Sequence, residues 1–212
     1  MNPFEKTNLP FLREDLNARF GEAGDRLFRL ATERCEALAA GADDGGVPAI
    51  REHLRAKLFP AMACYQALLQ SGIPREEALA FTGEETRRAA LAKRAQTARM
   101  ARLPGAYHLY RLGVRAYMGK FFPPEGWETE WVRCDGREIH FNLRRCLYWD
   151  QCNAQGCPEL CVLYCENDTI AFSGLLPKIR FERSGTLGSG AECCDFHFLR
   201  AGKDHGTPPS GR

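Results

Sequence analysis

The sequence predicts an α+β fold, with a helical N-terminal half packed on a small antiparallel sheet and one or two helices in the C-terminal half. Apolar residues recur at helical spacing as far as about residue 119, and beyond residue 126 they alternate as in strands. Pro123, Pro124 and Gly126 lie between the two patterns. We therefore divide the chain into a helical region 1–122, a Cys-rich α+β region 123–200, and a tail 201–212 whose composition predicts disorder.

Five helices are predicted in the first region. Leucines at helical spacing predict a first helix, which the breaker sequence before Pro48 ends. Pro48 suits the first turn of a second helix, which ends near Gly72. His53 and His108 lie within predicted helices, and we interpret them as surface or core polar groups. The predicted helices span residues 11–40, 48–72, 74–81, 84–102 and 106–119.

The second region is predicted to contain four strands and one helix. Asp135-Gly136 is a hairpin turn signal between the first two strands. Pro158 suits the first turn of the helix. The predicted elements are strands 127–133 and 138–148, a helix 158–168, and strands 179–183 and 193–199.

Composition limits the classes of function. The chain has 212 residues, 44% of them apolar, and a net charge of +2, which gives no electrostatic reason to expect a nucleic-acid partner. Residues 1–15 show no secretory pattern, and no segment approaches the roughly 20 apolar residues of a membrane helix. We expect a soluble, cytoplasmic protein with a small-molecule substrate and no membrane or nucleic-acid partner. A homo-oligomer stays open.

The 10 cysteines are unevenly distributed. Eight of them lie between Cys134 and Cys194. In a long chain without a secretory signal, thiols, metal ligands or catalytic thiolates are favoured over disulfides. We therefore place the chemistry of this protein in its C-terminal region.

The second predicted strand has one apolar and one polar face. Period-two alternation places these side chains on opposite sides of the strand. The polar face is either a solvated outer surface or the lining of a polar pocket. The apolar side carries Ile139, Phe141, Leu143 and Leu147, and the polar side carries His140, Asn142, Arg144, Cys146 and Tyr148.

The next helix carries three thiols and a carboxylate on one face, because Cys157, Cys161, Cys165 and Asp168 follow each other at steps of four, four and three. Cys157 and Cys161 are interpreted as small packing residues. A carboxylate beside buried thiols costs free energy unless it is paired or binds a ligand. Cys165 and Asp168 are therefore candidates for function, although Asp168 would also suit a helix end.

A glycine-rich segment precedes the last strand. Glycines at 185, 188 and 190 permit a tight turn or a close backbone approach. In a regular strand Cys194 and Asp195 point to opposite faces, so without a bulge they cannot both reach one pocket. We expect Cys194 to point toward the helix, and Asp195 to hold Arg183 or the loop by charge-assisted hydrogen bonds.

Taken together, these residues resemble the L-2-amino-thiazoline-4-carboxylic acid hydrolase family. The likeness spans about residues 139–198. Cys152, Cys157, Cys161 and Cys193 lie outside its pattern. The pattern consists of Cys146, Gly156 to Leu160, Cys165 with Asp168, Arg183 with Thr186 and Gly190, and Cys194 to Phe198.

The resemblance implies hydrolysis of a small sulfur- and nitrogen-containing heterocycle at its cyclic C=N bond, with no cofactor required. We hypothesise that Cys165 or Cys194 attacks the ring carbon as a thiolate, and that Asp168 is the general acid or base. The remaining candidates bind the substrate or shape its site. Arg183 or Arg144 would hold its carboxylate, Thr186 and the glycine-rich turn would offer N–H groups, and Asp195 would support them.

Two alternatives stay open. Cys146, Cys165, Asp168 and Cys194 are also a candidate ligand set for Zn²⁺, which would be structural or catalytic. The last strand and its glycines also look distantly like the ligand-binding 4-vinyl-reductase-type domains of bacterial sensors. That likeness implies a small-molecule-binding module without turnover.

Overall fold

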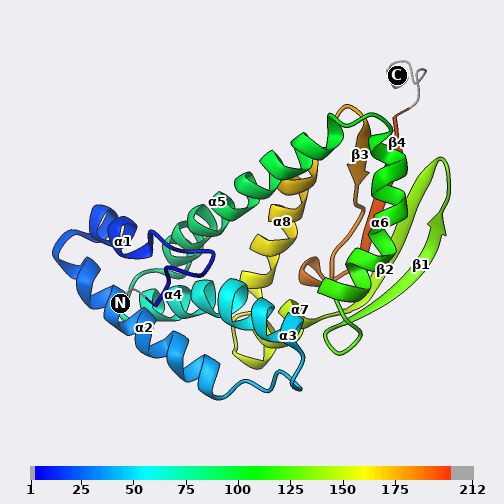
Figure 1. The fold of residues 1–212 in the computed structure, drawn as a ribbon. Helices are drawn as coiled ribbons and strands as arrows, with labels where there is room; N and C mark the ends of the chain where they lie inside the picture. Colours follow the sequence, from blue (N-terminus) through cyan, green and yellow to red (C-terminus); the bar gives the residue numbers. More distant parts are fainter. Residues whose placement is uncertain (1–2, 202–212) are drawn as a thin grey trace, which may run out of the picture.

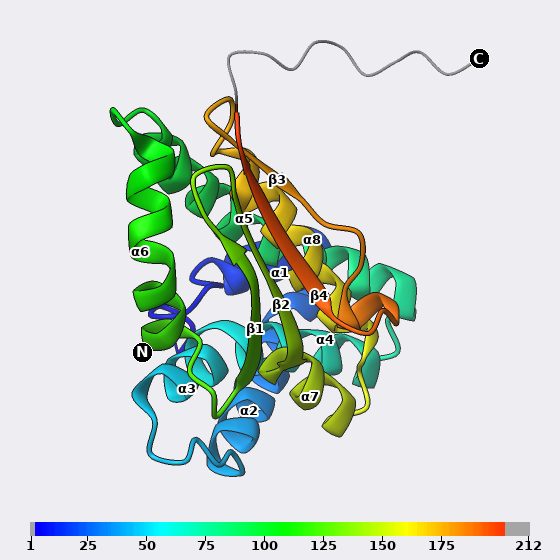
Figure 2. The same cartoon turned by 90° about the vertical axis from the view of Figure 1, so that its right-hand side faces the viewer.

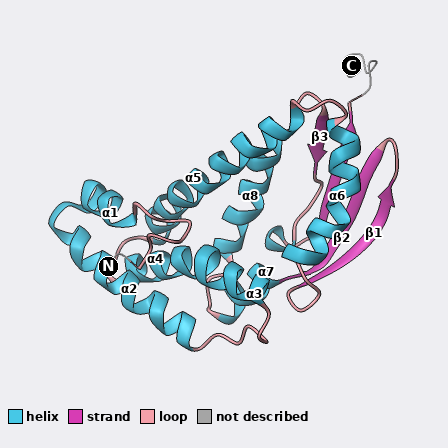
Figure 3. Ribbon diagram, in the orientation of Figure 1, coloured by secondary structure: helices cyan, strands magenta, loops and turns pink. Residues whose placement is uncertain are grey.

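The computed structural model describes residues 3–201 and has the predicted α+β fold (Figures 1 and 3). Except for Ala201, the predicted disordered tail lies outside the described residues. None of the helices in the described part is long and apolar enough to cross a membrane. The helices are α1 (Leu12–Phe20), α2 (Gly24–Ala40), α3 (Pro48–Glu52), α4 (Phe59–Gln70), α5 (Arg75–Ala101), α6 (Ala106–Phe121), α7 (Leu147–Ala154) and α8 (Glu159–Ser173), and the strands are β1 (Trp127–Cys134), β2 (Glu138–Cys146), β3 (Ile179–Glu182) and β4 (Cys194–Arg200).

The helical region differs from the prediction at two places. The helix predicted for 11–40 is interrupted between α1 and α2, where Gly21 has a φ of 56° that ends the first piece. The two helices predicted for 74–81 and 84–102 are one continuous helix, α5. Gly83 lies inside it because α8 passes close by: a Cβ at Gly83 would lie 3.2 Å from Leu163.

A π-helical segment, η2 (His53–Leu58), joins α3 to α4 within the helix predicted for 48–72. Pro60 follows it and has no N–H to donate to the carbonyl oxygen of Ala56 four residues earlier. That oxygen instead accepts a hydrogen bond from the backbone N–H of Asn8 at 2.8 Å. The irregular turn is therefore stabilised by the N-terminal segment.

The four strands form one antiparallel sheet in the order β1-β2-β4-β3. The Asp135-Gly136 hairpin is confirmed, since the backbone N–H of Asp135 donates to Glu138 O at 2.9 Å. The strand predicted for 138–148 ends at Cys146, where α7 begins. Figure 2 shows the sheet in front of α5 and α8, so one of its faces is turned away from the helices.

The alternation predicted for the second strand holds from Ile139 to Arg144, but not for Leu147 and Tyr148, which lie in α7. Ile139, Phe141 and Leu143 are buried on the inner face. In the register with β4, Phe141 lies opposite Phe196 with ring centroids 5.0 Å apart. His140, Asn142 and Arg144 lie on the outer face, where His140 is half-buried and stacks on His197 at 4.8 Å. The Cys146 thiol, in contrast, is buried.

Helices α6 and α8 cover the inner face. Tyr110 of α6 packs on Phe198 with ring centroids 5.3 Å apart, and Phe172 of α8 packs on the same ring at 5.0 Å. One hydrophobic cluster extends from Phe4 to Phe198 and so includes side chains of both predicted regions. This packing holds α8 against the sheet and against the segment between β3 and β4.

Candidate active site

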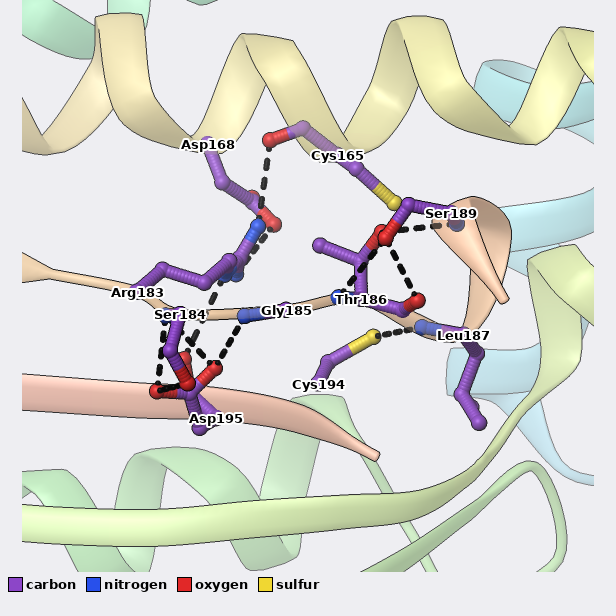
Figure 4. Close-up of polar contacts among 10 residues, drawn as sticks. All are labelled: Cys165, Asp168, Arg183, Ser184, Gly185, Thr186, Leu187, Ser189, Cys194 and Asp195. Carbon is purple, nitrogen blue, oxygen red and sulfur yellow. Dashed lines mark hydrogen bonds and ion pairs between the residues drawn. The ribbon is translucent and has the colours of Figure 1, made fainter. Parts of the chain in front are cut away.

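Three segments carry the candidate residues to one place: α8, the segment from Arg183 to Ser189, and the first residues of β4 (Figure 4). Cys165 and Asp168 face this segment from α8, one turn apart. Asp168 lies five residues before the end of α8, so it does not end the helix. Cys194 is buried at the start of β4, and Cys165 is half-buried.

The thiols of Cys165 and Cys194 shift each other's pKa in opposite directions. Hydrogen bonds from Cys161 and Cys194 lower the pKa of the Cys165 thiol, burial opposes this, and Thr186 and the charge of Arg183 lower it further. The bond to Cys165 and burial raise the pKa of Cys194. Cys194 Sγ also accepts a hydrogen bond from the backbone N–H of Leu187 at 3.2 Å. Of the two thiols, Cys165 is therefore the one whose pKa is lowered.

The glycine-rich turn lies directly on the sulfur atoms of α8. The short 3-10 turn η3 (Leu187–Ser189) begins after Thr186, whose hydroxyl accepts from the N–H of Ser189 at 3.1 Å. A Cβ at Gly188 would lie 3.3 Å from the Sγ of Cys165 and 3.5 Å from that of Cys161. Gly188 is thus required for close approach, as its sequence context indicated.

Arg183 is almost fully engaged by its neighbours. Its Nη2 lies 3.0 Å from Asp168 Oδ2, and its Nη1 donates to Cys165 O at 3.1 Å. Its Nε–H donates to Asp195 O at 3.4 Å, and the guanidinium stacks over Phe196 at 4.0 Å. Only 8% of the Arg183 side chain is exposed, compared with 40% for Asp168. Asp168 is therefore the more accessible member of this ion pair.

The carboxyl group of Asp168 has an altered acidity. Burial and the neighbouring Cys165 raise its pKa, whereas the charge and hydrogen bond of Arg183 lower it. The net result is a pKa of about 6. A carboxyl group with a pKa near 6 and a neighbouring thiol of lowered pKa suit acid–base chemistry with a thiol nucleophile.

Asp195 anchors the loop, as predicted. It points to the opposite side of β4 from Cys194. Its carboxylate accepts from the backbone N–H groups of Ser184 at 2.9 Å and Gly185 at 2.8 Å, and from the Ser184 hydroxyl at 3.0 Å. These bonds fix the segment that carries Arg183 and Thr186.

The structure does not bring Arg144 to this group. Its neighbour Leu143 is buried on the inner face, whereas Arg144 is exposed and its Nε lies 2.8 Å from Glu130 Oε2 of β1. An arginine on the outer face of the sheet is separated by the sheet from Cys165. Of the two arginines considered for the substrate carboxylate, only Arg183 lies at the site.

Within residues 3–201, no group of three or more Cys, His, Asp or Glu side chains is arranged to hold a metal ion. Zinc binding by Cys146, Cys165, Asp168 and Cys194 therefore stays a prediction. Cys146 lies at the junction of β2 and α7. Burial raises the pKa of its thiol to about 11, with smaller contributions from Cys165 and Asp168.

A second group of thiols adjoins the first. Hydrogen bonds from Cys157 and Cys161 lower the pKa of Cys152, against the effect of burial. Cys161 also lowers the pKa of Cys165, so a continuous series of thiols that shift each other's pKa extends from α7 to β4. The helical spacing of Cys157, Cys161 and Cys165 was the signal for this series, but the role of Cys152 on α7 was missed.

Two surface hollows lie near the site, and neither is lined by Cys165 or Cys194. One, of about 420 Å³, lies between α5 and α8. The other, of about 720 Å³, borders the loop on the side of Asp195. It is lined by Thr169, Phe181, Glu182, Arg183, Ser184, Asp195 and His197.

Comparison with known proteins identifies a family for this chain. The family model for L-2-amino-thiazoline-4-carboxylic acid hydrolase matches residues 51–198, which is more than half of the chain and includes each of the candidate site residues. No curated protein and no solved structure gives a significant match. The chain therefore belongs to the L-2-amino-thiazoline-4-carboxylic acid hydrolase family.

Proposed function

We propose that this protein hydrolyses L-2-amino-thiazoline-4-carboxylate, or a close cyclic analogue, with Cys165 as the nucleophile. The family name denotes a hydrolase of that compound. The observation that carries the proposal is the half-buried Cys165 thiol, whose pKa is lowered by neighbouring donors and which lies one turn from Asp168. Nucleophile and acid–base group are the two parts that opening an amidine-like ring requires.

The reaction proceeds in two balanced halves. The Cys165 thiolate forms a bond to the ring carbon of the protonated C=N group, and the electron pair of the C=N bond moves to the ring nitrogen. The ring carbon–sulfur bond then breaks, and the ring sulfur leaves as a thiolate that takes up a proton. The product remains bound to Cys165 as an isothiourea. Addition of water and departure of the Cys165 thiolate release N-carbamoyl-cysteine.

Asp168 serves as the general base in the second half. With a pKa of about 6 it is largely ionised at neutral pH, and it takes the proton of the attacking water. Arg183 is a positioning residue, because its partners leave little exposed surface for the substrate. Cys194 donates a hydrogen bond that stabilises the Cys165 thiolate. These steps use only side chains of this chain, and we expect a chelator to leave the rate unchanged.

The test compares three Cys→Ser variants at constant fold. Cys165→Ser is expected to lower kcat by more than about 10³-fold, as loss of a nucleophile does. Cys194→Ser is expected to cost less, because its hydroxyl can still donate to Cys165. Cys193→Ser is the matched control, since Cys193 lies on the other face of the chain from Cys194, and it should retain wild-type turnover.

The outcomes separate the alternatives. Equal, mild losses in Cys165→Ser and Cys194→Ser would remove the nucleophile. Binding of the thiazoline without any turnover by the wild-type protein would favour a small-molecule-binding module instead.

A further inference from the structure

The surface groove of about 420 Å³ between α5 and α8 has an apolar floor. Leu163 and Ile170 of α8 line it, and they point away from Cys165 because they lie roughly half a turn from it around the helix. Leu79 and Gly83 of α5 form the other wall. The helices approach closely at Gly83, where a Cβ would lie 3.2 Å from Leu163. The groove is therefore a feature separate from the thiols.

The rim of this groove is acidic. Three exposed carboxylates stand on it, those of Glu76, Glu84 and Glu166. Within the described chain, Arg87 is the one basic residue in the lining, and neither it nor the three carboxylates take part in an ion pair. An apolar floor inside a negatively charged rim suits an amphipathic helix with basic residues beside its apolar stripe.

Helix α6 has this character. The sequence between Glu85 and Glu125 contains nine Lys or Arg residues and no Asp or Glu, so α6 carries no acidic side chain. Leu109 and Leu112 are 49% and 73% exposed, and Leu112 is the most exposed large hydrophobic side chain in the described part of the chain. Lys120 is exposed on the same face of the helix. This face is apolar with basic flanks.

The α6 helix is held away from the groove of its own chain. Its opposite face packs on the sheet, where Tyr110 contacts Phe198 with ring centroids 5.3 Å apart. Figure 2 shows α6 along one edge of the molecule, beside the sheet. The groove follows α5 from Glu76 to Arg87, about 16 Å of helix, and Leu109 to Lys120 covers the same length of α6. An α6 helix that enters the groove therefore belongs to another molecule.

We propose that the groove between α5 and α8 binds helix α6 of a second copy of this chain. Leu109 and Leu112 of one copy pack on the apolar floor of the other, and Lys120 lies near the rim carboxylates. The two surfaces differ, so the contact is heterologous. Two copies close a dimer when each gives its α6 to the other, and otherwise the contact builds a ring or a filament. This inference is independent of the proposed function.

The test measures association of the full chain by sedimentation velocity over a range of protein concentrations. The wild-type chain is expected to associate, and less strongly as salt concentration rises, because the rim contacts are ionic. Leu112→Asp and Glu166→Lys should each weaken association by about tenfold or more, through a lost apolar contact and through like charges respectively. Both positions are exposed, and circular dichroism should show an unchanged fold.

Matched controls alter exposed residues of the same kind elsewhere. Leu176→Asp changes a leucine that is 55% exposed in the turn between α8 and β3, and Glu128→Lys reverses an exposed charge on β1. Neither position lines the groove or belongs to α6, so both variants should associate as the wild type does. Losses in the controls as large as in Leu112→Asp and Glu166→Lys would show that net charge, not this contact, controls association.

Mixing the two weakened variants tests the heterologous contact itself. The Leu112→Asp chain retains its groove and the Glu166→Lys chain retains its α6, so an equimolar mixture can form one intact contact. Native mass spectrometry should detect mixed dimers at concentrations where each variant alone is monomeric. Absence of mixed dimers would overturn the proposal. A wild-type chain that stays monomeric up to about 1 mM, or association unchanged in both variants, would overturn it equally.

Discussion

In both groups of cysteines around α8 the neighbouring thiols shift each other's pKa, but the two groups differ in their surroundings. Cys152 is 0% exposed, and the groups that lower its pKa are the thiols of Cys157 and Cys161. Cys165 is half-buried and has in addition the Thr186 hydroxyl and the charge of Arg183. A thiolate reacts when it is both stabilised and accessible. The comparison therefore leads us to expect reactivity at Cys165 and packing at Cys152.

After loss of Cys165 itself, the largest effect on activity should come from changing Asp168. This residue adjoins Cys165 and has no counterpart beside Cys152. For the wild-type protein, kcat should fall as pH decreases below about 6, because Asp168 becomes protonated and can no longer act as the base for the attacking water. Asp168→Asn should lower kcat by about 10²- to 10⁴-fold and abolish this acidic limb. The neighbouring exposed Glu166→Gln is the control. Persistence of the limb in Asp168→Asn would assign it to another group.

A smaller effect is expected from the loop anchor. Asp195→Ala removes the acceptor of the Ser184 and Gly185 N–H groups and should lower the free energy of unfolding by about 1–3 kcal/mol. By displacing Thr186 it should also lower kcat/KM by about tenfold or more. Asp135→Ala removes a similar carboxylate from the β1–β2 turn, where it accepts from Arg137 N, and should affect stability alone.

The stability effect of Asp195 also depends on pH. Burial raises its pKa, but the N–H groups of Ser184 and Gly185 outweigh burial and lower it below 3.8. A carboxyl group whose pKa is lower in the folded protein stabilises the fold at pH values above its pKa in the unfolded chain. This contribution is lost as pH falls through the folded-state pKa. The difference in unfolding free energy between wild type and Asp195→Asn should therefore shrink below about pH 4. A constant difference would show that the charge is not involved.

The smallest effect on activity should come from Cys152. Cys152→Ala should lower the unfolding free energy by about 1 kcal/mol through lost packing, and leave most of kcat/KM. Cys64→Ala, at an equally buried thiol of α4, is the matched control. A loss of activity in Cys152→Ala as large as in Cys165→Ser would mean that the two groups of thiols act as one.

Much of the site could be predicted because local spacing determines it. Steps of three and four place Cys165 and Asp168 on one face of a helix, and period two separates Cys194 from Asp195. Alternation with Leu143 places Arg144 on the polar face of β2, but the sequence does not show whether that face lines the site. Which face of a sheet meets the helices depends on tertiary packing.

The rest of the fold depends on contacts between distant segments. Leu147–Ala154 contains Tyr148 and Trp149, which favour strands, so the start of α7 gave no helical signal. The continuity of α5 through Gly83 depends on the approach of Leu163. The bond between His53 and Tyr148 joins residues 95 positions apart. No local sequence pattern predicts a contact between residues so far apart in the chain.

The most direct test of the central claim measures the alkylation rate of each cysteine as a function of pH, with residues identified by mass spectrometry. We expect Cys165 to be alkylated first and its alkylation rate to stay high well below pH 8. Activity should be lost in step with the modification of Cys165. Reaction of Cys165 only above about pH 8, as for an ordinary thiol, or earlier modification of Cys194, would contradict it.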